Sequence, residues 1–304
     1  MSQHDYNLAN GGGAAVRGDL NNALSAILSS NSGPSAPTVT APFMLWFDTT
    51  AGKLKMRDAA DASWATVPVA LGATGRLIKV TKYDGAALAG TVSATFTPQT
   101  DTQFLVVEVQ AGGAAGQQVS TAASTANARA CGGGQAGAYC KALITTGFSS
   151  VAVSVGGGGN GSNNAQLAGI ASSFGSFVSC SGGADPGTAA TAGTFPVVSS
   201  VGSTASGITT SGCTVIEQFD RAFGGPGIAF ANNIGMGGAG ANSRLGSGGG
   251  GVSVYGSTGA TSGNDAASGG YGAGGGGSAC MGTTTLPTKS GNGAGGCVIV
   301  YEYA

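Results

Sequence analysis

The chain has 304 residues and a formal net charge of −1 at pH 7, and only 8% of its residues are charged. Ordinary globular proteins have about 25% charged residues, and nucleic-acid-binding surfaces need clustered Lys and Arg, of which this sequence has no run. We therefore expect no nucleic-acid partner and no binding to anionic membranes. We also expect no membrane insertion, because the sequence lacks a long apolar stretch. We expect synthesis in a cytosol, because the sequence lacks the pattern of a secretory signal peptide.

The first predicted region, residues 1–42, contains a polar arm, one helix and a linker. Apolar residues recur at helical spacing over residues 14–30, and a Ser/Pro/Thr-rich segment follows. The apolar seam consists of Val16, Leu20, Ala23, Leu24 and Ile27. A lone helix of this length is marginal in water, so we expect the seam to associate with other copies in a short bundle. The alternative is that the helix packs on its own domain.

The second predicted region, residues 43–75, has the pattern of a small β-meander. Polar and apolar residues alternate from Lys53 to Arg57, which is the period of a strand, and turn-forming residues precede this run and follow it. Trp46 and Trp64 would supply most of the buried area of so small a module. We therefore expect these two tryptophans to take part in oligomer packing.

The third predicted region, residues 76–304, is dominated by glycine. The chain has 59 glycines, of which only ten precede Phe104, whereas average usage is about 7%. Collagen is excluded because there are nine prolines and no strict triplet, which leaves a flexible linker or an ordered domain. Short apolar runs between the glycines favour order. They span residues 104–109, 142–144, 151–155 and 298–301. We expect a mainly β fold in which this region is a glycine-rich β-sandwich with polyglycine-type extended segments.

All six cysteines fall in the glycine-rich region, and none forms a C-x-x-C pair. The only histidine is His4, so the close ligand pairs of a zinc site are missing. We expect no metal and no cofactor. Small buried thiols are the expected state of the cysteines, with disulfides as the alternative.

The sequence offers few groups for catalysis. Ser-His-Asp and Cys-His mechanisms need an imidazole base, which the glycine-rich region lacks. Glycoside hydrolysis needs only two carboxylates, and Glu217 and Asp220 lie close together in the sequence. The alternative for this pair is an exposed loop, and we expect the protein not to be an enzyme. The glycine runs also lack the Lys-Ser or Lys-Thr that would complete a phosphate-binding loop.

Aromatic residues set among the glycines are the candidates for ligand binding. They are Phe219, Phe223, Phe230, Tyr255 and Tyr271. An exposed aromatic ring gives a large contact area at low entropic cost, which suits sugars and protein epitopes. The alternative is that these rings fill the interior of the domain. Tyr271, which lies between two glycines, is the first candidate for exposure.

Two stretches carry a resemblance to a known family. Residues 46–57, followed by Trp64 and Val67, resemble a module of the tail fibre proteins of tailed bacteriophages, and the preceding helix is similar to their N-terminal part. Residues 106–113, 132–139, 151–159 and 295–303 resemble parts of the glycine-rich domain of phage tail fibres, in the same order. Residues 186–231 match nothing in this pattern and are expected to be the variable, recognising part.

The resemblance implies a homotrimeric virion protein at the distal tail. Its N-terminus would attach to tail or baseplate proteins, and its glycine-rich domain would bind a host receptor, which could be a glycan, a pilus or an outer-membrane protein. Two alternatives stay open. One is a polysaccharide depolymerase that uses Glu217 and Asp220, and the other is a structural fibre segment that carries a separate adhesin.

Overall fold

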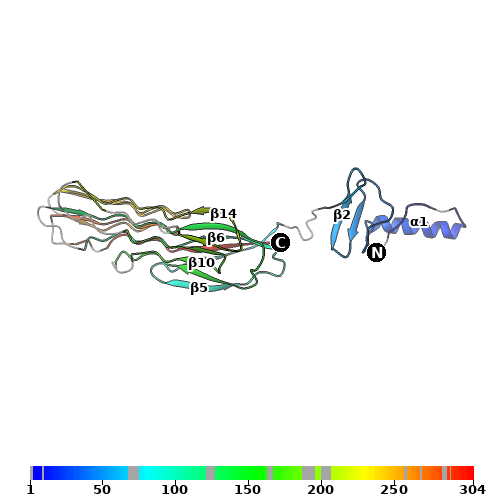
Figure 1. Cartoon of the computed structure of the whole chain (residues 1–304), viewed down its shortest axis with the longest axis horizontal. Coiled ribbons are helices and arrows are strands. Elements are labelled where there is room, and N and C mark those ends of the chain that lie inside the picture. The colour runs from blue at the N-terminus through cyan, green and yellow to red at the C-terminus, as the bar shows by residue number, and fades with distance from the viewer. Residues whose placement is uncertain are drawn as a thin grey trace. The chain divides into compact units, whose positions relative to one another are not determined.

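The structure is a computed structural model that describes residues 3–8, 10–67, 75–120, 127–162, 167–186, 196–199, 207–256, 259–267, 269–282, 286–287 and 289–304. The described residues form one α-helix and five antiparallel sheets, so the expected mainly β fold is confirmed (Figure 1). The chain divides into two compact units, Met1–Arg76 and Leu77–Ala304. The first two predicted regions fall within the first unit, and the glycine-rich region corresponds to the second.

The helix of the first unit, α1 (Gly13–Leu28), lies close to the range expected for it. It ends where Ser30 and Asn31 adopt positive φ angles of 50° and 52°, which cannot continue a right-handed helix. The N-terminal arm is in contact with this region rather than extended into solvent. A ring nitrogen of His4 lies 2.8 Å from Asp19 Oδ1, and Gln3 Nε2 donates to Ser35 O at 2.7 Å.

The expected β-meander forms from β1 (Leu45–Asp48), β2 (Lys53–Arg57) and β3 (Trp64–Thr66). The turn between β1 and β2 is closed by Asp48, whose Oδ1 accepts hydrogen bonds from the backbone N–H groups of Thr50 and Ala51, each at 3.0 Å. The meander also touches the segment after the helix, because Phe47 N donates to Ser30 O at 3.2 Å. This contact explains why the helix and the meander form one unit.

The second unit is built around two five-stranded sheets. The first sheet has the order β14-β8-β6-β20-β4 and the second has the order β13-β11-β10-β9-β5. The strands of the first sheet are β4 (Leu77–Asp84), β6 (Phe104–Gln110), β8 (Tyr139–Ile144), β14 (Thr214–Phe219) and β20 (Cys297–Tyr303). Those of the second sheet are β5 (Thr91–Phe96), β9 (Val151–Gly156), β10 (Ser172–Phe174), β11 (Val178–Cys180) and β13 (Ile208–Thr210).

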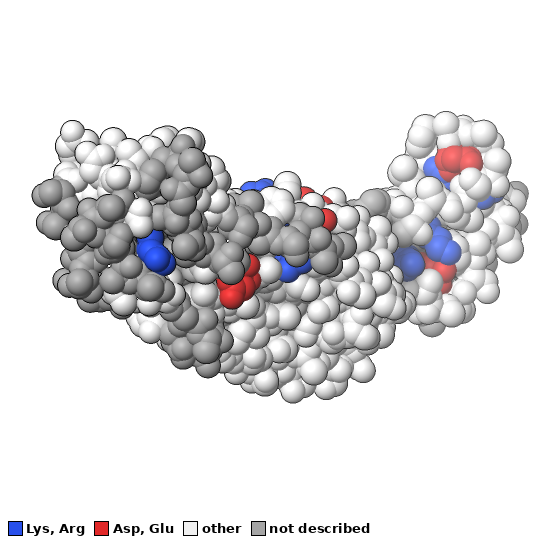
Figure 2. All heavy atoms as spheres, turned by 60° about the vertical axis from the view of Figure 1, so that its left-hand side comes forward, with Lys and Arg blue, Asp and Glu red and all other residues white. Residues whose placement is uncertain are grey.

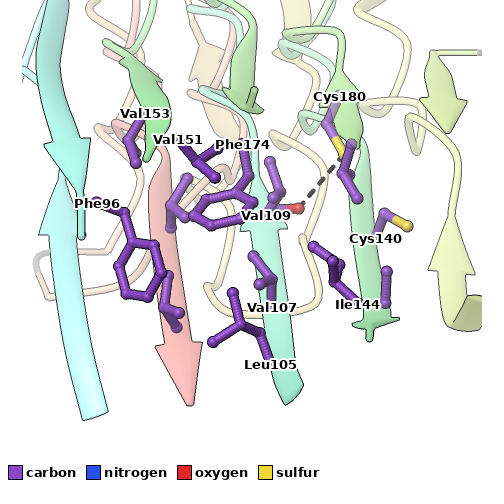
Figure 3. Packing of buried hydrophobic residues seen from close by; sticks show 14 of the residues in the cluster. Phe96, Leu105, Val107, Val109, Cys140, Ile144, Val151, Val153, Phe174 and Cys180 are labelled. Atoms are coloured by element: carbon purple, nitrogen blue, oxygen red, sulfur yellow. Dashed lines mark hydrogen bonds between the residues drawn. The ribbon is translucent and has the colours of Figure 1, made fainter. Parts of the chain in front are cut away.

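The main hydrophobic core lies between these two sheets (Figure 3). Alternate residues of β6, namely Leu105, Val107 and Val109, point into it and are fully buried, as the period of two residues in a strand requires. They meet Phe174 from the second sheet, and the Cys180 thiol donates to Val109 O across the interface at 3.4 Å. Each buried Val, Leu or Phe side chain stabilises the fold by about 1.5–3 kcal/mol.

Two smaller sheets complete the second unit. One has the order β12-β15-β16-β17 and the other the order β18-β19-β7. Their strands are β7 (Ala128–Ala130), β12 (Val197–Val198), β15 (Ile228–Ala231), β16 (Ile234–Gly237), β17 (Val252–Tyr255), β18 (Gly259–Thr261) and β19 (Ala279–Met281). The core that they share is small and consists mostly of alanine and valine, together with Met281.

Glycine-rich segments connect the large sheets to the small ones and run side by side (Figure 1). Residues 111–116 illustrate how they are held. Their N–H groups donate in turn to three neighbours, 135–138, 167–170 and 291–294, so that every third residue meets the same neighbour. The bonds are Ala111 to Ala138 (3.0 Å), Gly112 to Ile170 (3.0 Å), Gly113 to Ala294 (2.9 Å), Ala114 to Gln135 (2.8 Å), Ala115 to Leu167 (2.7 Å) and Gly116 to Gly291 (2.9 Å).

Close approach of the backbones, rather than an unusual backbone angle, explains why glycine is needed here. A Cβ atom added to Gly113 would lie far inside van der Waals contact with the carbonyl oxygen of Ala273. A Cβ added to Gly134 would overlap the carbonyl oxygen of Ala114 in the same way. Neither glycine has a positive φ. The segments can therefore pack at this distance only where a residue has no side chain.

Candidate functional site

One face of the sheet β12-β15-β16-β17 is apolar and exposed. The register places Ile228 opposite Met236 and Ile234 opposite Tyr255, so their side chains share a face. Tyr255 is 79% exposed, and Phe230 and Met236 are each 46% exposed. The residues of this surface, which we call the apolar face, are Val198, Ile228, Phe230, Ile234, Met236 and Tyr255.

The opposite face of the same sheet is buried. Ala229, Val252 and Val254 pack there with Ala128 and Met281 in the small core. None of the four strands contains a charged residue. The apolar face is thus a firmly backed surface that lacks charge, and such surfaces mark sites of interaction with other molecules.

A pocket of about 240 Å³ lies beside the end of β14. Its aromatic side is formed by Phe219, which is half exposed, and Tyr139, which is buried, with their ring centroids 6.2 Å apart. Its polar side includes Asp220, Asn242 and Arg244. We call this hollow the β14 pocket.

The structure does not bring the five aromatic residues predicted for binding into one site. Phe230 and Tyr255 lie on the apolar face, whereas Phe219 lines the β14 pocket. Phe223 is exposed on the segment between β14 and β15. For these four residues the alternative, that the rings fill the interior, does not hold.

Tyr271 differs from the expectation of a freely exposed ring. It is half buried because its hydroxyl is held against β4. The hydroxyl donates to Asp84 Oδ1 at 2.6 Å and accepts from Lys82 Nζ at 2.8 Å. The hydrogen bond from Tyr271, assisted by Lys82, lowers the pKa of Asp84, and partial burial opposes this effect. The ring therefore fastens a glycine-rich turn to the first sheet.

The two carboxylates considered for catalysis have separate partners. Glu217 Oε1 accepts from Arg244 Nε at 3.2 Å, and Asp220 Oδ1 accepts from the backbone N–H of Gly207 at 3.1 Å. Glu217 lies within β14, whereas Asp220 follows the end of that strand and lines the β14 pocket. Because each carboxylate is bound to a partner of its own, the geometry adds no support to catalysis.

The residues predicted for oligomerisation fall into two groups. On α1, Leu20, Leu24 and Ile27 are exposed, Val16 is half buried, and Ala23 is buried. The apolar seam therefore lies largely open on the single chain. The seam remains a predicted surface for association.

The two tryptophans are engaged within their own unit. Trp46 is only 5% exposed, its Nε1 donates to Gly33 O at 3.2 Å, and its ring centroid lies 5.3 Å from that of Trp64. Lys55 and Arg57 lie over the two rings, at 4.7 Å and 5.2 Å from their centroids. This packing places Trp46 in the interior of the unit rather than on a surface that a second copy could contact.

All six cysteines lie among the described residues and are free thiols, five of them buried and Cys213 half buried. Burial raises the pKa of the Cys131 and Cys297 thiols to about 12 and that of Cys140 to about 11. The described part of the chain contains no cluster of His, Cys, Asp and Glu side chains that could hold a metal ion. It also contains no helix long and apolar enough to cross a membrane.

Charged side chains are sparse and mostly paired on the surface of the molecule. On the face shown in Figure 2, Lys, Arg, Asp and Glu form isolated spots among uncharged residues. The pairs include Lys141 with Glu108 (3.1 Å) and Lys289 with Asp265 (2.9 Å). Any ligand of this surface would be bound mainly by apolar contact and by neutral hydrogen bonds.

Several residues of these sites were not predicted from the sequence. Val198, Ile234 and Met236 of the apolar face lie in short runs with weak strand signals. Asn242 and Arg244 lie in a turn between two glycine runs, where the polar residues could have indicated a loop. Compared with known proteins, the chain matches no family model and no curated protein sequence.

Proposed function

We propose that this protein is a tail fibre protein of a tailed bacteriophage and that its second unit binds a receptor on the host cell. The observation that carries the proposal is the apolar face, an uncharged surface with exposed aromatic rings on a rigidly hydrogen-bonded support. Aromatic anchors of this kind contribute most to binding when they are held in place before the ligand arrives. The resemblance of the sequence to phage tail fibres adds to this support.

The proposed fold of the second unit is a glycine-rich β-sandwich with polyglycine-type extended segments. The hydrophobic core between the two five-stranded sheets supports the first part of this description. The period of three residues in the hydrogen bonds of 111–116 supports the second, since an extended helix with three residues per turn directs its N–H groups to three sides. Such a scaffold would hold surface rings rigidly without a large core.

The proposed role of the first unit is attachment and assembly. The open seam of α1 supports association into a homotrimer, because Leu20, Leu24 and Ile27 would gain burial there. Tail or baseplate proteins are the proposed partners of the N-terminus. The protein would be synthesised in the host cytoplasm and would act at the distal tail of the virion.

The proposed action is adhesion rather than catalysis. The receptor classes that suit an uncharged aromatic surface are a glycan, a pilus or an outer-membrane protein. Because few charges lie on the binding surfaces, adsorption should depend only weakly on salt. A loss of adsorption on raising salt to about 0.5 M would contradict this part of the proposal.

The test is saturable binding of labelled protein to a panel of bacterial strains. The full-length protein and the fragment 76–304, which contains the whole second unit, should bind the same strains. The double variant Phe230→Ala/Tyr255→Ala should lose at least about thirtyfold in affinity, since removing central aromatic anchors costs about 2 kcal/mol or more. Phe43→Ala, which removes an exposed ring from the first unit, is the matched control and should bind normally.

Two results would favour the alternatives. If neither the full-length protein nor the fragment bound any strain while both were folded by circular dichroism, a structural segment with a separate adhesin would be favoured. If purified protein cleared the capsule around cells and the Glu217→Ala/Asp220→Ala variant did not, the protein would be a depolymerase.

A further inference from the structure

Hydrogen bonds hold the shape of the β14 pocket, because they join its floor to one wall and close its other wall on itself. Its floor is the segment that begins at Ala136, whose N–H donates to Ala222 O at 3.0 Å in the wall that follows β14. The other wall is the turn that carries Asn242 and Arg244. Asn242 Oδ1 accepts from Gly248 N at 2.8 Å, which closes this turn on itself. The pocket therefore exists before any ligand binds.

The pocket combines an aromatic platform with polar groups that can form further hydrogen bonds. Phe219 is 49% exposed and is supported from behind by Tyr139, which is 2% exposed. Within the described part of the chain, Asp220 accepts one hydrogen bond, from Gly207, although a carboxylate can accept about four. Among the described residues, Arg244 has one acceptor, Glu217, although a guanidinium has five N–H donors. A ligand could thus meet an acceptor and a donor at the edge of one ring.

The charges in the pocket select against ionic ligands. Glu217 Oε1 lies 3.2 Å from Arg244 Nε and offsets the charge of the guanidinium. Asp220 adds a negative charge of its own to the pocket. A phosphate or carboxylate ligand would be repelled by Asp220, and a cation would be repelled by the guanidinium of Arg244. A neutral ligand with several hydroxyl groups suits this arrangement, because its hydroxyls can donate to Asp220 and accept from Arg244 and Asn242.

The size of the pocket restricts the ligand further. Its volume of about 240 Å³ is below the range of about 300–1,000 Å³ that is typical of sites for drug-sized ligands. A single sugar ring fits this space, and its apolar C–H face can pack on Phe219 while its hydroxyls reach the polar side. We infer that the β14 pocket binds one neutral pyranose residue of a glycan. This inference rests on the proposed function, in which the glycan belongs to the host surface, and it adds a sugar subsite separate from the apolar face.

The experiment is ligand-observed NMR with full-length protein and four free sugars, namely glucose, galactose, mannose and rhamnose, at millimolar concentrations. Saturation transfer from the protein to at least one sugar is expected. Asp220→Asn keeps an oxygen that can accept from Gly207 N but removes the charge, and it should weaken binding by about tenfold, as expected for loss of a hydrogen bond to a charged group. Phe219→Ala should weaken binding by a similar factor.

The matched control is Phe230→Ala, which removes a ring of similar exposure from the apolar face and should leave sugar binding unchanged. Absence of saturation transfer from all four sugars would overturn the inference, and so would equal binding by the wild type and the two pocket variants. The proposed function is judged separately by adsorption to cells. Adsorption without sugar binding would remove the subsite alone, whereas sugar binding without adsorption to any strain would leave the subsite and remove the receptor-binding function.

Discussion

Two regions of the second unit are stabilised in different ways, namely the large sheets with the core between them and the glycine-rich segments. Between the sheets, side chains such as Leu105, Val107 and Phe174 are fully buried and supply hydrophobic stabilisation. In the segments around 111–116 and 291–294, few side chains are present, and the backbones approach until their N–H and C=O groups bond directly. The comparison shows that a chain with little apolar surface can be ordered by satisfying its backbone instead.

The two regions also differ in what they tolerate. A hydrophobic core adjusts to a lost methyl group at a graded cost, because the surroundings relax in part. At glycine positions such as Gly113, a segment that lies in backbone contact with its neighbours cannot admit a Cβ atom without moving a carbonyl group. Adding a methyl group should therefore destabilise the glycine-rich segments, whereas removing side-chain atoms should destabilise the core.

The largest effect is expected from Gly113→Ala. The new Cβ would overlap the Ala273 carbonyl, so the segments would have to separate and give up their hydrogen bonds. We expect a loss of more than about 4 kcal/mol, in the range of severe point mutations, and little folded second unit. Gly250→Ala is the control, because its nearest neighbour is Asn264 Nδ2 at 3.6 Å, and its free energy of unfolding should change by less than about 1 kcal/mol. Equal denaturation curves for the two variants would contradict the backbone-contact account.

Phe174→Ala should have the next largest effect. This ring is fully buried between the sheets, with the Phe96 ring centroid 5.5 Å away, and its removal should cost about 3–5 kcal/mol. Phe223→Ala removes an exposed ring and should change stability by no more than about 0.5 kcal/mol. Urea denaturation followed by far-ultraviolet circular dichroism measures both. A cost for Phe174→Ala as small as that of Phe223→Ala would show that the sheets do not depend on this core.

Gly18→Ala tests the same substitution where glycine has no close neighbour. Gly18 lies within α1 with nothing within 4 Å of an added Cβ, so alanine should stabilise the helix by about 0.5–1 kcal/mol. Gly52→Ala also meets no neighbour, but φ is +63° there, so that variant should lose stability. The midpoint temperature of thermal unfolding, measured on full-length protein by circular dichroism at the helix band, should rise for Gly18→Ala and fall for Gly52→Ala. A loss of stability in Gly18→Ala would mean that the helix surface is covered in the assembled protein.

The smallest effect is expected from Tyr271→Phe, which removes the hydroxyl that holds a glycine-rich turn to β4. Its bond to Asp84 lowers the pKa of that carboxyl, so its contribution is present above the ordinary pKa of about 3.9 and is lost as pH falls through the lowered pKa. The variant should lose less than about 1 kcal/mol near pH 6, and the difference from wild type should shrink as the pH falls through the lowered pKa of Asp84. Tyr255→Phe, whose ring is exposed, is the control and should show no such difference. A difference that grew on acidification would exclude the assigned role of Asp84.

The candidate sites were predicted only in part, for reasons that individual residues make clear. Phe230 and Tyr255 were recognised as aromatic residues among glycines, but their common face depends on the pairing of β15, β16 and β17, with an irregularity beside Phe230. Arg244 reaches Glu217 across 27 positions of the sequence. No local pattern indicates such a contact, and the β14 pocket was therefore missed.

Local sequence patterns were sufficient to locate the individual helix and strands named below. Alternation and turn residues indicated the meander, helical spacing indicated α1, and apolar β-branched runs indicated β6, β9 and β20, because these signals act over a few neighbouring residues. Tertiary structure alone decided that Trp46 is buried and that Tyr271 is tied to β4. It also decided which glycine-rich segments are neighbours. A glycine has no side chain that could specify a partner, so only the assembled backbone, in which each N–H must find a carbonyl group, determines where these segments lie.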